Sequence, residues 1–321
     1  MSEVKRSPAV LALHDARAGN ARQAEALARA LDPVAWASTA LQPRAPWRWL
    51  APRRWPGAGQ AFGAPFAQAL AQPPRLAIGC GRQAALATRL LRARGASAVQ
   101  ILDPRLDRRH WDLVIVPEHD RLRGDNVLTL LGSLHPVDDE WLAAGRADFP
   151  ALARLPAPRA ALLIGGPTAQ VPWTVPALQA LCTPLLARLR EAGGSVLATT
   201  SRRTPPPVAD FLQQALQGLP HCLWRGAQDG RNPYAGLLGW ADRIVCTADS
   251  ANLLSEACAT GAPATAWFQD IAGGRLQHLS AALRERGRLV APPDLFDAAP
   301  ATPLRETARI AAQVRQRLQL P

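Results

Sequence analysis

Residues 241–263, ADRIVCTADSANLLSEACATGAP, decide the fold of the second half of the chain. Within them, residues 244–246 (IVC) are typical of the end of a short buried strand, and a polar turn follows. Apolar residues then recur at helical spacing, and Gly261 is the expected end of that helix. Asp249 or Ser250 is its expected N-cap. The segment therefore predicts a strand, a tight turn and a helix.

The turn and Glu256 together predict a nucleotide-binding site. A helix N-terminus leaves several backbone N–H groups unpaired, and these suit a phosphate. Glu256 lies about six residues into the helix, which is roughly 9 Å along its axis at about 1.5 Å per residue. This is about the reach from a diphosphate to the neighbouring ribose, so we expect one carboxylate to bind both ribose hydroxyls. The alternative is an ordinary strand–helix unit in which Glu256 is a solvated helix residue.

Composition and charge limit the class of protein. The chain has 321 residues, 48% of them hydrophobic, and a net charge of +12. This length predicts two domains of about 150 residues each. The positive charge favours phosphates, nucleotides or an anionic membrane surface. There is no zinc-finger spacing or other nucleic-acid motif, so nucleic acid is not an expected partner.

Cysteine usage and hydropathy predict the cellular location. The five cysteines are scattered and form no C-x-x-C pair, so small buried residues in a reducing cytosol are the expected interpretation. No signal-peptide core is visible, and no apolar run approaches the length of a bilayer span. We expect a cytoplasmic protein, associated at most peripherally with the inner face of the cytoplasmic membrane.

Strands and helices alternate in both halves of the chain, which indicates parallel sheets with right-handed crossovers. In the first half, the pattern predicts strands over 9–13, 75–79, 98–102, 113–116 and 126–131, and helices over 21–31 and 84–94. In the second half, it predicts strands over 160–164, 195–199, 221–224 and 264–268, and helices over 175–191, 205–217 and 305–318. The proline-containing segment 145–158 is the expected boundary between a Rossmann-like domain over 1–150 and another over 151–300.

Candidate donor-binding residues follow the strands of the second half, where ligands of parallel sheets bind. Two arginines and several hydroxyls after the strand 195–199 are typical of a phosphate or carboxylate clamp. A Gly-Gly pair after the strand 160–164 would let a ligand approach bare backbone. The expected donor site consists of Gly165, Gly166, Ser201, Arg202, Arg203, Thr204, Asp249, Ser250 and Glu256. The alternatives are a simple turn at the glycines and a capped helix with solvated arginines.

Two polar clusters follow strands of the first half and include groups suited to general-base catalysis. The candidate catalytic residues are Asp15, Glu118 and His119. The neighbouring residues expected to contact an acceptor are His14, Gly19, Asn20, Gln23 and Asp120. The alternatives are that His119 is a structural histidine and that the flanking acids are cap or turn residues.

No metal ion or other cofactor is expected. The chain lacks an Asp-x-Asp pair that would hold a divalent ion on a diphosphate, and Asp138-Asp139-Glu140 are expected to cap a helix at Trp141. Helix dipoles and arginines would instead neutralise a leaving diphosphate.

The segment 43–66 interrupts the alternation and carries Trp47, Trp49 and Trp55 among prolines and arginines. Tryptophan prefers the membrane–water interface, and arginine is attracted to anionic headgroups. We expect a loop that places its rings in the surface of an anionic membrane. The alternative is that the rings pack inward as a lid on the first domain.

Several of these stretches resemble known proteins. The segment 241–263 is similar to the nucleotide-sugar site of glycosyltransferases of the two-Rossmann (GT-B) architecture. The resemblance implies that the helix N-terminus holds the diphosphate and that Glu256, in the pair Glu256-Ala257, holds the ribose. It also implies two Rossmann-like domains that face each other across a cleft, with a terminal helix over 301–321 that packs back on the first.

The whole chain resembles the mitochondrial fission Elm-type family. The matching stretches are GNARQAEALARAL (19–31), GCGRQAALATRLLR (79–92), DLVIVPEHDRLRGDNVL (112–128), LLIGGPTA (162–169), TTSRRTP (199–205) and TADSANLLSEACATGAP (247–263). Plant members are linked to mitochondrial division, and bacterial members to glycosyltransferases or nucleotide-sugar enzymes. One departure is that the family usually has a small residue where this chain has His14-Asp15 after its first strand.

The residues and the resemblance together lead to one expected function and two alternatives. We expect an inverting, metal-independent glycosyltransferase that moves a sugar from a nucleotide sugar to an envelope glycolipid or glycan, such as one of the lipopolysaccharide type. The alternatives are a nucleotide-sugar epimerase on the same architecture and a non-enzymatic adaptor of the mitochondrial-fission type. A base and an intact arginine clamp favour an enzyme, because an adaptor needs neither.

Overall fold

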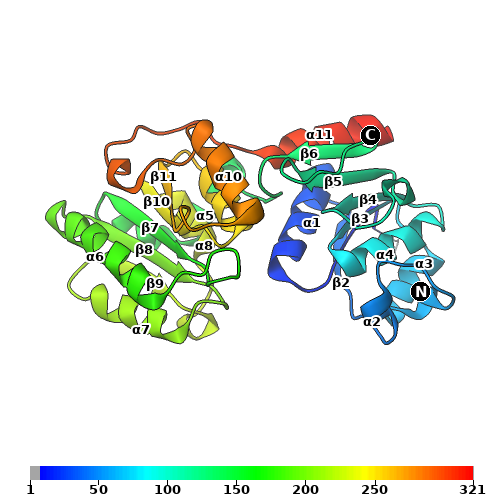
Figure 1. The fold of residues 1–321 in the computed structure, drawn as a ribbon, viewed down its shortest axis with the longest axis horizontal. Coiled ribbons are helices and arrows are strands. Elements are labelled where there is room, and N and C mark those ends of the chain that lie inside the picture. The colour runs from blue at the N-terminus through cyan, green and yellow to red at the C-terminus, as the bar shows by residue number, and fades with distance from the viewer. Residues whose placement is uncertain (1–7, 321) are drawn as a thin grey trace. The chain divides into compact units, whose positions relative to one another are not determined.

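The computed structural model describes residues 8–320, which form two units (Figure 1). The first unit combines the chain up to Pro136 with the C-terminal segment from Glu306, and the second unit covers Val137–Arg305. Each unit contains one parallel sheet covered by helices.

The first unit contains a six-stranded parallel sheet of order β2-β1-β3-β4-β5-β6. Its strands are β1 (Val10–His14), β2 (Trp36–Ala40), β3 (Leu76–Cys80), β4 (Ser97–Ile101), β5 (Leu113–Pro117) and β6 (Val127–Leu130). The strand order reverses between β1 and β3, whose last residues, His14 and Cys80, lie side by side in the register. Such a reversal is a switch point, where open α/β sheets bind their ligands.

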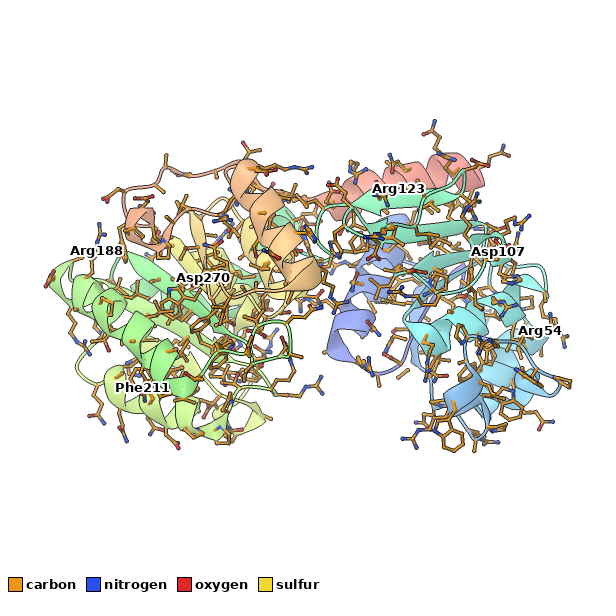
Figure 2. The ribbon with its side chains drawn as sticks, in the orientation of Figure 1. Arg54, Asp107, Arg123, Arg188, Phe211 and Asp270 are labelled. Carbon is orange, nitrogen blue, oxygen red and sulfur yellow. The ribbon has the colours of Figure 1, made fainter. Side chains whose placement is uncertain are left out.

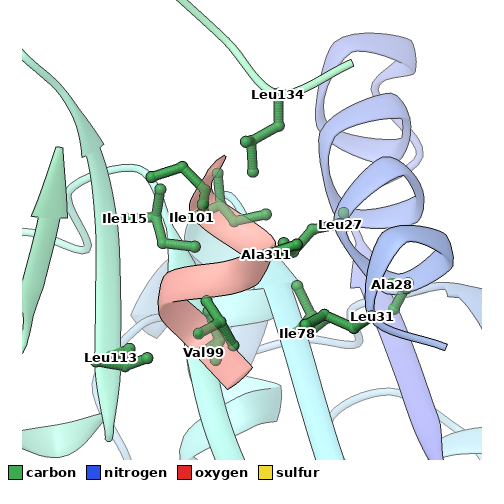
Figure 3. Close-up of a cluster of buried hydrophobic side chains, with 14 of the residues drawn as sticks. Leu27, Ala28, Leu31, Ile78, Val99, Ile101, Leu113, Ile115, Leu134 and Ala311 are labelled. Atoms are coloured by element: carbon green, nitrogen blue, oxygen red, sulfur yellow. The ribbon is translucent and has the colours of Figure 1, made fainter. Parts of the chain in front are cut away.

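Helices cover both faces of this first sheet. They are α1 (Ala18–Leu31), α2 (Trp47–Leu50), α3 (Ala64–Ala71), α4 (Arg82–Arg92) and α11 (Glu306–Leu318). Side chains alternate between faces along a strand, so Val10 and Ala12 of β1 pack with α1 and α11, while Leu11 and Leu13 pack with α3 and α4. Figure 3 shows the first of these clusters, in which Ala311 of α11 lies among residues of α1 and the sheet.

The second unit contains a five-stranded parallel sheet of order β11-β10-β7-β8-β9. Its strands are β7 (Arg159–Ile164), β8 (Ser195–Thr200), β9 (His221–Trp224), β10 (Arg243–Thr247) and β11 (Ala264–Trp267). Its helices are α5 (Asp139–Asp148), α6 (Val175–Glu191), α7 (Pro206–Ala215), α8 (Tyr234–Trp240), α9 (Ala251–Cys258) and α10 (Gly274–Glu285). The switch point of this sheet lies between β7 and β10.

The division between the units comes earlier in the chain than the segment 145–158. Helix α5 begins with Asp138 as N-cap, whose carboxylate accepts the N–H of Trp141 at 2.7 Å, as the acidic run predicts. The helix then packs on α8 of the second unit. Gly145 makes this contact possible, because a Cβ there would lie 2.5 Å from the backbone of Ala235. Packing of α5 therefore assigns it to the second unit.

The predicted α/β fold with parallel sheets is confirmed, and the helix over 175–191 and the strand over 221–224 have the expected bounds. The prediction that α9 extends to Gly261 is wrong. The helix ends at Cys258, because the N–H groups of Ala259 and Thr260 donate to carbonyls three rather than four residues back. The guanidinium of Arg288 donates to the carbonyls of Cys258 and Thr260 at this end. Within the described residues, no helix has both the length and the apolar composition needed to cross a bilayer.

Candidate functional site

Asp249 joins three loops at the carboxyl edge of the second sheet. Its Oδ2 atom accepts the N–H of Gly166, after β7, at 3.0 Å and a guanidinium N–H of Arg203, after β8, at 3.0 Å. Its Oδ1 atom accepts the indole N–H of Trp173 at 3.4 Å. The carboxylate itself is fully buried, whereas the side chain of Arg203 is 51% exposed. The buried acid thus holds an arginine at the switch point, with half of its side chain open to solvent.

The glycine pair after β7 allows this close approach. A Cβ at Gly165 would lie 2.2 Å from Oδ2 of Asp249, and a Cβ at Gly166 would lie 2.2 Å from the carbonyl oxygen of Arg203. The N–H of Gly165 is bound by Oγ1 of Thr247 at 2.8 Å. The glycines are therefore required by the packing of the chain's own loops, which is a more specific role than a simple turn.

Hydroxyl groups after β8 hold the arginine loop in place. The Thr204 hydroxyl donates to the carbonyl of Gly165 at 2.5 Å and accepts the N–H of Ser201 at 2.8 Å. The Ser201 hydroxyl accepts the N–H of Arg203 at 3.2 Å. Arg202 is exposed. Ser201 and Thr204 thus shape the loop, and the two arginines are the groups that face solvent.

The N-terminus of α9 lies directly after Asp249. Ser250 is the N-cap, and its hydroxyl accepts the N–H of Leu253 at 3.4 Å. Asp249 is not the cap, because its carboxylate is bound to the loops after β7 and β8. The first turn of a helix has no intrahelical acceptors for its N–H groups, so those of Ala251 and Asn252 suit an anion.

Glu256 lies on α9 and is 2% exposed. Its Oε2 atom accepts the hydroxyl proton of Tyr234, on α8, at 2.5 Å. The alternative that Glu256 is a solvated helix residue is therefore wrong. A carboxylate held inside the fold by a tyrosine has a fixed direction, as a group that binds one ligand part requires.

Three residues of this edge were not predicted from the sequence: Thr247, Trp173 and Tyr234. Trp173 stacks on Phe268, with ring centroids 5.5 Å apart and planes 7° apart. The separation in sequence between Trp173 and Asp249, 76 residues, explains why no local pattern indicates the contact. Tyr234 is likewise 22 residues from Glu256. Only the folded sheet brings these partners together.

The switch point of the first sheet places Asp15 directly after β1. Its Oδ1 atom accepts an amide N–H of Asn20 at 2.8 Å and the backbone N–H of Arg17 at 3.3 Å. Gly81, directly after β3, has a φ of +90°, which favours glycine, and a Cβ there would lie 2.5 Å from Nδ2 of Asn20. Asp15 and Asn20 are thus brought together, as the sequence predicts.

His14 belongs to a polar chain that runs from β1 to α1 and β2. Its Nδ1 atom accepts the N–H of Ala16 at 3.2 Å, and its Nε2 atom lies 3.2 Å from Oγ of Ser38 and 3.6 Å from Oε1 of Glu25. The Ser38 hydroxyl donates to Glu25 at 2.7 Å. Ser38 was missed by sequence reasoning because the strand β2 was not predicted, and Glu25 was missed because its partner Ser38 lies on that strand.

The remaining first-unit candidates lie apart from Asp15 or face their own helix. The Gln23 side chain is buried and donates to the carbonyl of Gly19 at 3.3 Å within α1. Glu118 is exposed after β5, and Nε2 of His119 lies 3.8 Å from a carboxylate oxygen of Asp120. Strands β3 and β4 separate β5 from β1, which is roughly 14 Å at about 4.8 Å per strand. The structure therefore does not bring the two catalytic clusters together.

Most of the cysteines lie in the interior of the fold. Burial raises the pKa of Cys182 and of Cys258 to about 12, which makes both poor nucleophiles. Four of the five cysteines are buried, as expected of small core residues. Across residues 8–320, no group of three or more histidine, cysteine and acidic side chains is arranged to hold a metal ion.

A family model described as "Mitochondrial fission ELM1" matches residues 18–318. A protein of Arabidopsis thaliana named "Mitochondrial fission protein ELM1" is 31% identical over 276 residues, which cover 76% of this chain and 64% of that protein. The chain thus spans less than two thirds of the length of this relative.

Two solved structures share the fold over nearly the whole chain. The UDP-GlcNAc 2-epimerase of Neisseria meningitidis bound to UDP-GlcNAc has a TM-score of 0.53 at 11% identity, covering 97% of this chain and 100% of that chain. The UDP-GlcNAc 2-epimerase of Methanocaldococcus jannaschii in complex with UDP-GlcNAc and UDP has a TM-score of 0.51 at 12% identity, covering 96% and 99%. The predicted GT-B-like fold class is confirmed by this likeness, which at such identities concerns the fold alone.

Proposed function

The chain belongs to the mitochondrial fission ELM1 family, and from this premise we propose that it is a sugar-nucleotide enzyme whose second unit binds the nucleoside diphosphate. The observation that carries the proposal is the Arg203–Asp249 pair at the switch point of the second sheet. A buried acid that orients a half-exposed arginine preorganises a cation for a ligand, and guanidinium N–H groups match phosphate oxygens. The UDP-sugar complexes formed by proteins of this fold support the same ligand class.

We assign the parts of the ligand to separate groups at this edge. The diphosphate is held by Arg203, by Arg202 and by the free N–H groups at the start of α9. The ribose hydroxyls are held by the carboxylate of Glu256, with Tyr234 fixing its direction. The hydroxyls of Ser201 and Thr204 keep the arginine loop in shape.

The reaction that we propose is glycosyl transfer with inversion. A first-unit carboxylate removes the proton of an acceptor hydroxyl, whose oxygen attacks the anomeric carbon of the donor sugar. The bond from that carbon to the phosphate oxygen breaks, and the arginines and the helix dipole stabilise the negative charge of the leaving diphosphate without a metal. Asp15 is favoured over Glu118 as the base, because it lies at the switch point of its sheet. The acceptor class that we propose is an envelope glycolipid or glycan, reached from the cytoplasm.

Epimerisation is the second candidate function, because both solved structures with this fold described above are UDP-GlcNAc 2-epimerases. An epimerase would convert a nucleotide sugar in the absence of any acceptor, which NMR of the sugar ring protons detects. An adaptor, as the name of the Arabidopsis relative suggests, would need neither an oriented arginine nor a buried glutamate at this edge.

The test is calorimetric, after a thermal-shift screen of UDP-, GDP-, ADP- and CMP-sugars has identified the nucleotide. Loss of one charge-assisted hydrogen bond costs about 1.5–3 kcal/mol, so Arg203→Gln should weaken binding about 10- to 150-fold. The matched control Arg154→Gln removes an exposed charge elsewhere in the second unit and should leave affinity unchanged.

The assignment of Glu256 to the ribose is tested by comparing a ribonucleotide with its 2′-deoxy form. The wild type should bind the ribonucleotide more tightly than its 2′-deoxy form, and Glu256→Gln should lose most of this preference. Equal affinity of the wild type and Arg203→Gln, or absence of binding by all four nucleotide classes, would contradict the proposal.

A further inference from the structure

The positive charge of the chain is concentrated in one stretch of the first unit. Residues 33–102 contain nine arginines and no aspartate or glutamate, whereas the whole chain has a net charge of +12. The arginines are Arg44, Arg48, Arg53, Arg54, Arg75, Arg82, Arg89, Arg92 and Arg94. This stretch forms β2 to β4 with the helices between them. Three quarters of the net charge therefore comes from a segment with no acidic residue of its own.

Two of the tryptophans in this stretch face solvent. The side chain of Trp49 is 66% exposed and that of Trp55 is 53% exposed. Trp47 instead packs partly buried against the core, where its ring lies 3.3 Å from the position of a Cβ at Gly57. Of the three rings in the segment 43–66, Trp47 thus packs inward, whereas Trp49 and Trp55 face solvent. Two large aromatic side chains of this segment are therefore available at the surface of the unit.

Helix α4 holds the exposed rings on a fixed support. The side chains of Arg82 and Gln83 donate to the backbone carbonyl of Arg48 at 3.1 and 2.9 Å. Arg89 donates to the carbonyl of Pro52 at 2.7 Å. These bonds anchor the backbone on both sides of Trp49. The segment that carries the rings is therefore held in place before docking. Docking then loses less conformational entropy than it would with a mobile loop.

A small hollow of about 360 Å³ lies beside Trp55. Leu70 and Leu90 contribute to its apolar lining, and Arg54 and Arg94 also line it. Arg54 is labelled at the periphery of the first unit in Figure 2. Burial and the nearby charge of Arg54 both lower the pKa of Arg89. Arg54 and Arg89 therefore lie close enough to repel each other, and the sequence between them contains no carboxylate. A hollow that combines leucine side chains with two arginines matches an anionic phospholipid, whose phosphate is negatively charged and whose acyl chains are apolar.

We propose that this tryptophan–arginine face, formed by Trp49, Trp55, Arg53, Arg54 and the hollow beside them, docks on an anionic lipid bilayer. Tryptophan rings favour the membrane interface, and the arginines are attracted to its negative surface potential. The leucine side chains in the hollow favour lipid over a nucleic acid, because leucine offers neither a charge for a phosphate nor an aromatic ring on which a base could stack. The docking face rests on these residues alone and is independent of the nucleotide site in the second unit.

Vesicle co-sedimentation tests the charge contribution. Phosphatidylcholine vesicles with phosphatidylglycerol should bind the wild-type protein at low salt, and pure phosphatidylcholine vesicles should bind it far less. Arg53→Gln combined with Arg54→Gln should weaken partition about 30-fold, since each arginine near the surface contributes about 1 kcal/mol. The control Arg154→Gln combined with Arg284→Gln lowers net charge equally, but on the second unit, and should retain binding.

The ring contribution is tested by Trp49→Ala combined with Trp55→Ala. We expect at least about a tenfold loss of partition, because two large apolar groups no longer enter the interface. The control Val34→Ala combined with Ile271→Ala removes the other large exposed hydrophobic groups of the described residues and should bind as the wild type does.

Equal partition on both lipid compositions would overturn the proposal, as would equal losses in the face variants and their controls. Displacement of the protein from vesicles by single-stranded DNA, with the same dependence on the two tryptophans, would assign the face to nucleic acid instead. All variants should keep the nucleotide affinity of the wild type, so failure here and failure of the nucleotide site are distinguishable.

Discussion

The carboxyl edges of the two sheets each place an aspartate within two residues of the end of a strand beside the switch point, but the two aspartates are held in different ways. Asp249 is buried and binds partners that lie 83, 46 and 76 residues away in the sequence. Asp15 binds Arg17 and Asn20, which lie two and five residues away in its own turn. One aspartate organises three loops, and the other belongs to one turn.

This difference predicts a division of roles between the units. The second edge is assembled by the fold itself, so its arginine is oriented before any ligand arrives, as preorganised electrostatic sites require. The first edge depends on a local turn and can accommodate changes near Asp15 at low cost. We infer that the second edge serves an invariant ligand part, such as a nucleotide, and that the first serves the variable acceptor.

The largest expected effect concerns the first edge. Asp15→Asn should lower kcat by about 10²–10⁴-fold, because an amide cannot accept the acceptor's proton, while nucleotide affinity stays within error. Steady-state kinetics of the proposed transfer reaction measure this. Glu118→Gln is the matched control, since Glu118 lies after β5, away from the switch point. Full activity of Asp15→Asn would show that Asp15 is not the catalytic base.

The next effect concerns stability and sharpens the contrast directly. Asp249→Ala leaves the buried donors of Gly166 and Trp173 without an acceptor, and each costs about 1–3 kcal/mol, so we expect a loss of about 2–6 kcal/mol in the free energy of unfolding. Asp15→Ala should cost less than about 1 kcal/mol, because its partners are near the surface. Urea unfolding of both variants measures the two values. Similar losses at both positions would show that the edges are built alike.

Local patterns predict much of the fold and only part of the site. Helix α6 and strand β9 have the predicted bounds, because apolar spacing and flanking prolines and glycines act within a few residues. Strand β2 was missed, because WASTA at the sheet edge is short and only partly buried. The placement of Glu256 on a helix after a strand was predictable from the segment itself.

The interior role of Asp249 was not predictable from sequence. Its neighbours in the chain suggest a helix cap, and that role belongs to Ser250. The contact that decides its role is with Arg203, 46 residues earlier. Likewise, the segment 43–66 indicates exposed tryptophans, but only packing separates Trp47 from the other two rings. Interactions that depend on the meeting of distant loops carry no local signal.

Hydrogen exchange measured by mass spectrometry tests the central claim most directly, in the presence and absence of the nucleotide found by screening. We predict slower exchange in residues 165–174, 201–204 and 248–256. Asp249 joins these three segments, and the third also contains Glu256. Residues 14–20 should exchange at an unchanged rate with nucleotide alone, because we assign the first edge to the acceptor and not to the nucleotide. Protection confined to residues 14–20, or no protection at the second edge under conditions where calorimetry detects binding, would contradict the account.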